Sequence, residues 1–123
     1  MQQTTDGGYV LGGYSSSEIG GDKTVANWDT TNYFYDYWIV KIDSNGIKQW
    51  DKRYGGVNGD WFDFLRQMKD NGYLLSGWSY SGVDGDKTQD TCGLSDGWIV
   101  KTDSVGNIQW DKDYRLNIFS DEL

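Results

Sequence analysis

The feature that most constrains the fold is an internal repeat that spans nearly the whole chain. The segment 6–24 aligns without gaps onto 70–88, an offset of 64 residues, and 11 of 19 positions are identical. The segment 36–54 aligns onto 96–114, an offset of 60 residues, and 13 of 19 positions are identical. Repetition at this level predicts that the chain is built from two copies of one supersecondary unit.

Each copy has the pattern of β structure. Apolar and polar residues alternate over short segments that are bounded by glycine, asparagine and aspartate, which is typical of strands and tight turns. The composition agrees, because 17 glycines and 16% aromatic residues favour strands and turns over helices. The expected strands of the second copy are 60–69, 73–79, 97–103 and 107–114. The counterparts of the last three lie between Tyr9 and Tyr54 in the first copy. A helix is the alternative over 61–69, but the segment is short and its surroundings are β.

Four strands joined by turns, repeating about every 60 residues, predict a blade of a β-propeller. The expected fold class is therefore all-β, with two four-stranded antiparallel blades. Residues 1–57 form the first blade, whose first strand is truncated to 1–5, and residues 58–123 form the second blade plus the start of a further strand. Because a propeller needs about four to eight blades, the ring is completed by oligomerisation or by further repeats.

Three strings carry a resemblance to a known family: Asp6–Gly13, Trp38–Gly46 and Gln49–Gly56. They resemble the sixty-residue propeller repeat of secreted bacterial surface proteins. The resemblance implies an extracellular or cell-surface setting and a binding or scaffold role, and it supplies no catalytic residues. Small two-repeat bacterial lectins that assemble propellers from several chains are similar, which implies a head-to-tail homo-oligomer. The chain itself begins with no basic or apolar segment of a signal peptide.

Composition removes several classes of function. The chain has no histidine and one cysteine, Cys92, so histidine-dependent catalysis, histidine metal sites and an intramolecular disulfide are excluded. The net charge of −8 disfavours a nucleic-acid partner. No apolar run approaches the roughly 20 residues of a membrane span, so membrane insertion is not expected. No cofactor is expected either.

Candidate ligand-binding residues lie in the long connections. In an up-and-down sheet these connections, 15–35, 55–59 and 79–95, share one face, and variable loops on a rigid scaffold are where binding resides. The candidates are Trp28, Tyr33, Tyr35, Trp61, Trp78 and Tyr80. They suit a carbohydrate or a surface protein, and the alternative is that they cap strand ends or pack on the neighbouring blade. The matched tryptophans Trp38, Trp50, Trp98 and Trp110 are instead expected in the core.

The acidic residues suggest a weaker hypothesis. Asp84, Asp86 and Asp90 resemble the first half of a calcium loop, but the loop lacks an acid at its twelfth position, Ser95. An ordinary Asp-Gly turn is therefore favoured over a metal site. The repeated lysines, Lys41 and Lys101, are expected to pair with repeated carboxylates such as Asp43 and Asp103.

Two functions follow from these patterns. The first is a non-catalytic extracellular binding or assembly module, with no enzymatic activity. The alternative is a glycan hydrolase that uses two carboxylates separated by about 5 to 9 Å, because the chain carries 19 acidic residues.

Overall fold

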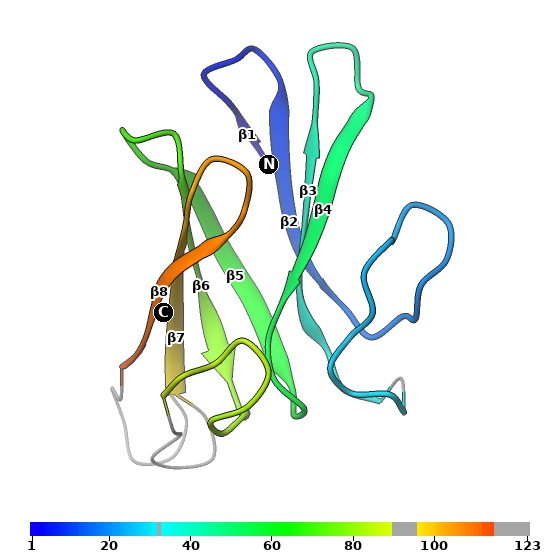
Figure 1. Ribbon diagram of the computed structural model, residues 1–123, viewed down its shortest axis with the longest axis vertical. Helices are drawn as coiled ribbons and strands as arrows, with labels where there is room; N and C mark the ends of the chain where they lie inside the picture. Colours follow the sequence, from blue (N-terminus) through cyan, green and yellow to red (C-terminus); the bar gives the residue numbers. More distant parts are fainter. Residues whose placement is uncertain (32, 90–95, 115–123) are drawn as a thin grey trace.

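The computed structural model describes residues 1–31, 33–89 and 96–114, and the regular elements within them are all β strands. They form two four-stranded antiparallel sheets, each with its strands in sequence order (Figure 1). The strands are β1 (Gln2–Gln3), β2 (Tyr9–Ser15), β3 (Asp36–Ile42), β4 (Lys48–Tyr54), β5 (Asp60–Gln67), β6 (Tyr73–Ser79), β7 (Asp96–Thr102) and β8 (Ile108–Tyr114). The all-β fold with two four-stranded sheets is thus confirmed, and the helical alternative over 61–69 is wrong. In the described part of the chain there is no helix that could span a membrane.

The two sheets are the two sequence repeats, down to their irregularities. The pairing of β3 with β4 shifts register after Lys41, and that of β7 with β8 shifts after the matched Lys101. The turns that follow are also matched, because Gly46 and Gly106 both adopt positive φ, 83° and 86°. Only glycine takes this conformation without strain, so each repeat fixes the same hairpin at the same place.

Short and long connections lie at opposite ends of the sheets (Figure 1). The turns β1–β2, β3–β4, β5–β6 and β7–β8 lie at one end, and the connections 16–35 and 55–59 lie at the other. The second end, called the loop end below, is where the chain brings together segments that are far apart in sequence. Asp90, Cys92 and the start of a further strand in 117–123 lie outside the described residues.

The core lies between the two sheets. It contains Val10, Tyr37, Ile39 and Tyr54 from the first sheet and Tyr73, Leu75, Trp98 and Val100 from the second. Two buried tyrosines bond across it: the Tyr37 hydroxyl donates to the Trp98 carbonyl at 3.0 Å, and the Tyr54 hydroxyl donates to the Gly106 carbonyl at 2.6 Å. Each hydrogen bond offsets the free-energy cost of burying the tyrosine hydroxyl and the carbonyl that accepts from it.

Close approach of the sheets depends on Gly12. A side chain at this position would collide with the ring of Phe62, which also packs edge-on against Tyr37 at 5.8 Å. The glycine therefore leaves the space that the phenylalanine of the next repeat fills.

Because only one face of each sheet is covered, matched tryptophans have different environments. Trp98 is 0% exposed between the sheets, whereas Trp110 is 45% exposed on the outer face of the second sheet. The expectation that all four matched tryptophans lie in the core is therefore wrong for Trp110 and for Trp38. Trp38 is half-buried on the outer face of the first sheet, and Trp50 is half-buried against Tyr73, with ring centroids 6.0 Å apart.

The repeated lysines pair with acids other than the expected ones. Lys41 bonds to Asp6 at 3.0 Å, and Lys101 bonds to Asp70 at 2.9 Å. Asp43 instead accepts the backbone N–H groups at positions 45 and 47, and Asp103 accepts those at 105 and 107. The aspartates at these turns shape the backbone, which is their usual role there.

Candidate functional site

A strip of aromatic side chains crosses the loop end from the first sheet to the second. Its members are Tyr14, Tyr35, Trp61, Trp78 and Tyr80, called the aromatic strip below. Tyr14 meets Tyr35 edge-on at 5.1 Å, and Tyr35 lies 5.9 Å from Trp61. Trp61 in turn contacts Tyr80 at 5.2 Å and Trp78 at 6.1 Å. Four of the six predicted ligand-binding residues thus form one continuous aromatic surface.

A shallow hollow of about 360 Å³ opens beside the strip. It is lined by Phe34, Asn58, Gly59, Trp61 and Tyr80. A side chain at Gly59 would collide with the Trp61 indole, so the glycine lets the ring lie flat against the backbone. The Tyr80 N–H donates to the Gly59 carbonyl at 2.8 Å, which fixes the two walls of the hollow relative to each other.

The hollow combines aromatic walls with one polar side chain. Asn58 is exposed at its rim, and its amide lies 3.5 Å from the Tyr80 carbonyl. Ligand pockets of this size are lined mostly by apolar and aromatic groups, with a few polar groups that orient the ligand. Asn58 was not a candidate in the sequence, because it sits in a short connection without an aromatic or charged pattern.

The two remaining candidates lie apart from this hollow. Trp28 stacks on the Arg53 guanidinium at 4.2 Å and donates from its indole N–H to Asp86 at 3.0 Å. Tyr33 is exposed and packs on Phe34 at 5.0 Å, outside the lining of the hollow. Trp28 therefore joins the two repeats and does not extend the aromatic strip.

The acids of the calcium hypothesis bond to the protein itself. Asp86 accepts from the Arg53 guanidinium at 2.9 Å, from Trp28 and from the Gly55 N–H at 3.2 Å. Asp84 accepts from the Val57 N–H at 2.8 Å. Among the described residues, no group of three or more potential metal-ligating side chains comes together. The described part of this segment is thus a junction between repeats.

Two carboxyl groups meet at the loop end, and both are buried. Asp36 begins β3 and Asp60 begins β5, and their side chains flank Gly55. Asp60 accepts from the Ser81 hydroxyl at 2.9 Å and the Gly56 N–H at 2.9 Å, whereas Asp36 Oδ1 has no donor when both acids are ionised. Burial raises the pKa of Asp36 to about 7 and that of Asp60 well above its ordinary value. The raised pKa values favour the protonated form of the pair, and both carboxyl groups are buried, at 1% and 0% exposure.

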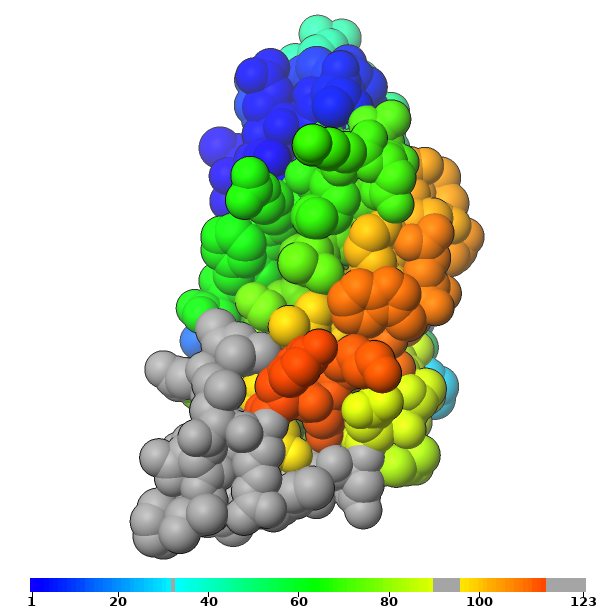
Figure 2. Space-filling view, turned by 90° about the vertical axis from the view of Figure 1, so that its left-hand side faces the viewer, coloured from blue at the N-terminus to red at the C-terminus, as the bar shows by residue number. Residues whose placement is uncertain are grey.

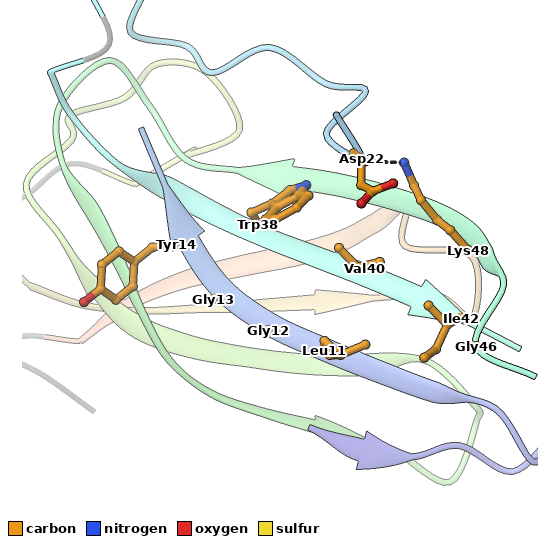
Figure 3. Close-up of a pocket in the computed structure, with 10 residues that line it drawn as sticks. All are labelled: Leu11, Gly12, Gly13, Tyr14, Asp22, Trp38, Val40, Ile42, Gly46 and Lys48. Carbon is orange, nitrogen blue, oxygen red and sulfur yellow. Dashed lines mark hydrogen bonds between the residues drawn. The ribbon is translucent and has the colours of Figure 1, made fainter. Parts of the chain in front are cut away.

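A second hollow lies on the outer face of the first sheet and reaches the aromatic strip only at Tyr14. It measures about 630 Å³, and Figure 3 shows its apolar floor of Leu11, Trp38, Val40 and Ile42, from β2 and β3. Lys48 bounds one end, where its ammonium donates to the Asp22 carbonyl at 2.5 Å. This hollow was not predicted from the sequence, because alternation identifies the two faces of a strand and does not reveal which face stays open.

Comparison with known proteins adds no assignment to these sites. No protein-family model matches the chain, and no curated protein matches it either.

Proposed function

We propose that the chain is a non-catalytic, extracellular binding module, and that the hollow beside the aromatic strip takes a carbohydrate. The observation that carries the proposal is the pair of the half-buried Trp61 and the exposed Tyr80, held at 5.2 Å around a hollow of about 360 Å³ with the Asn58 amide at its rim. Sugar rings present flat C–H faces to aromatic rings and hydroxyl groups to amides. Large rigid aromatics also provide contact area at low conformational cost.

The charge of the protein favours a neutral sugar. With a net charge of −8, the molecule repels anionic ligands. The extracellular setting rests on the resemblance to the repeats of secreted bacterial surface proteins. A hydrolase is not proposed, because the carboxyl pair that the fold brings together, Asp36 and Asp60, lies buried.

A glycan array followed by calorimetry tests the proposal. We expect binding of neutral oligosaccharides without release of cleaved sugar. Trp61→Ala and Tyr80→Ala should each weaken binding at least about tenfold, the equivalent of about 1.4 kcal/mol. Trp110→Ala is the control, because this tryptophan is more exposed than Trp61 but lies on the outer face of the second sheet, away from the hollow. Unchanged affinity in the Trp61 and Tyr80 variants, or no binding to any neutral glycan, would refute the site.

A further inference from the structure

The interface between the two sheets shows how two faces of this repeat pack together, and it is called the template below. In it, the first sheet contributes Trp50 and Tyr54, and the second contributes Tyr73, Trp98 and the turn at Gly106. Trp50 packs on Tyr73 at 6.0 Å, and the Tyr54 hydroxyl donates to the Gly106 carbonyl at 2.6 Å. Each sheet thus presents two different faces, one of the Trp50 type and one of the Trp98 type.

Both types recur, uncovered by the described residues, on the outer sides of the molecule. The outer face of the second sheet, called the back face, carries Trp110 and Tyr114, the repeat counterparts of Trp50 and Tyr54 at an offset of 60 residues. Trp110 is 45% exposed and Tyr114 is 46% exposed. Figure 2 looks onto this side, with colours that run from green at β5 to orange at β8.

The outer face of the first sheet, called the front face, is the counterpart of the Trp98 face. Trp38 and Val40 correspond to Trp98 and Val100, and Gly46 corresponds to Gly106. All three line the hollow of about 630 Å³. The front face therefore has the apolar floor and the turn carbonyl that the template uses. The β5 side of the template, where Phe62 and Leu65 pack against the core, has only the two-residue β1 as its counterpart.

We propose that the back face of one copy packs into the front face of a second copy, which repeats the contact made within the chain. The Tyr114 hydroxyl of one copy donates to the carbonyl of Gly46 of the partner subunit, as Tyr54 does to Gly106. The Trp110 ring packs on Tyr9 of the partner subunit, as Trp50 does on Tyr73. This inference goes beyond the proposed function, because neither face includes the hollow beside the aromatic strip.

Differences at matched positions make the contact between copies weaker than the contact within the chain. On the front face, Lys48 stands where the template has Ile108, which packs against the core. Tyr37, which packs on Trp98 at 5.1 Å and bonds to its carbonyl, has Gly97 as its counterpart on the back face. Trp38 of the partner subunit therefore meets no ring and no hydroxyl there. The net charge of −8 adds repulsion between copies that salt screens, so we expect association to strengthen as salt rises.

The contact joins two different faces, so it is heterologous, and repetition closes a ring or extends a filament. Rings of about four to eight blades close in known propellers. Two sheets in each copy then give closed assemblies of about two to four copies, and the finite size distinguishes a ring from a filament.

Blocking one face at a time tests the proposal. Val40→Arg fills the front hollow, and Trp110→Arg puts a charge on the back face without removing a buried group. We expect either variant alone to sediment as a monomer of 14.0 kDa. An equal mixture should give a one-to-one dimer and nothing larger, because each variant keeps the face that the other has lost. Circular dichroism checks the fold, and Leu11→Arg with Tyr114→Arg provides a second pair if either variant unfolds.

The outcomes separate this proposal from the ligand site. Trp61→Ala should assemble like the unmodified chain, and both blocked variants should keep the glycan affinity of the unmodified chain. Self-assembly of a blocked variant, or a mixture that stays monomeric, would overturn head-to-tail packing and leave the glycan proposal standing.

Discussion

Trp38 and Trp98 occupy the same position of the two repeats but differ in their surroundings. Both donate from the indole N–H to the matched aspartate of the next strand, Asp51 at 2.9 Å and Asp111 at 3.0 Å. Yet Trp98 is fully buried between the sheets, and Trp38 lines an open hollow. The same local sequence therefore builds the same strand pair and side-chain bond, and only the neighbour across the face decides how much area is buried.

The largest expected effect is the difference in unfolding free energy between alanine variants of these two tryptophans. Trp98→Ala removes a fully enclosed ring, and such deletions cost about 3 to 5 kcal/mol. Trp38→Ala removes a half-buried ring, so we expect about half that loss or less. Urea unfolding in dilute solution, where copies are separate, measures both. Equal losses of unfolding free energy in the two variants would contradict a core that is formed on one face of each sheet only.

The buried acid pair gives the next effect, in the pH dependence of stability. Because burial raises the pKa of Asp36 from 3.8 to about 7, the folded protein keeps a proton that the unfolded chain has released. The free energy of unfolding should therefore fall as pH rises from about 4 to 7. Asp36→Asn should flatten this slope and stabilise the protein at pH 8 by about 1 to 2 kcal/mol, since the new amide can donate to Asp60 in place of the proton.

The control for this slope is Asp29→Asn. Asp29 accepts hydrogen bonds from the Thr31 side chain and from backbone N–H groups, and these bonds lower its pKa to about 2. Its stabilisation is lost only below about pH 4, so the substitution should leave the slope between pH 4 and 7 unchanged. If the slope between pH 4 and 7 is unchanged in Asp36→Asn, another group binds the proton. Asp113 is then the first group to test, because burial raises its pKa to about 6.

The smallest effect compares two matched tyrosines. Tyr54 is 3% exposed and bonds across the core to Gly106, so Tyr54→Phe leaves a buried carbonyl without its donor. The expected loss is about 1 to 2 kcal/mol. Tyr114→Phe changes an exposed hydroxyl and should alter monomer stability by less than about 0.5 kcal/mol. Thermal unfolding of both variants in dilute solution measures the difference, and an equal loss would contradict the one-sided core.

The sequence was sufficient for the strands and their grouping, because repeat, alternation and turn residues are local signals. The sequence was not sufficient for burial and for ion pairs, because both depend on which residues of other strands lie nearby. Trp110 carries the same local pattern as Trp50, and only the position of its repeat in the chain leaves it exposed. The pairing of Lys41 with Asp6, 35 residues away, likewise follows from strand register and not from proximity along the chain.

The candidate site was predictable in part for the same reason. Trp61, Trp78, Tyr35 and Tyr80 were identified because the long connections meet at one end of an antiparallel sheet. Asn58 and Gly59 were missed, since a short connection gives no pattern, and the acid pair was missed because Asp36 and Asp60 meet only when the two sheets pack.

The central claim is that the two outer faces are complementary because they repeat the interface inside the chain. Sedimentation equilibrium of the unmodified chain, from about 1 to 100 micromolar at physiological salt, tests it most directly. We expect a reversible, concentration-dependent assembly that stops at a defined small multiple of 14.0 kDa. A folded monomer across the whole range would contradict it.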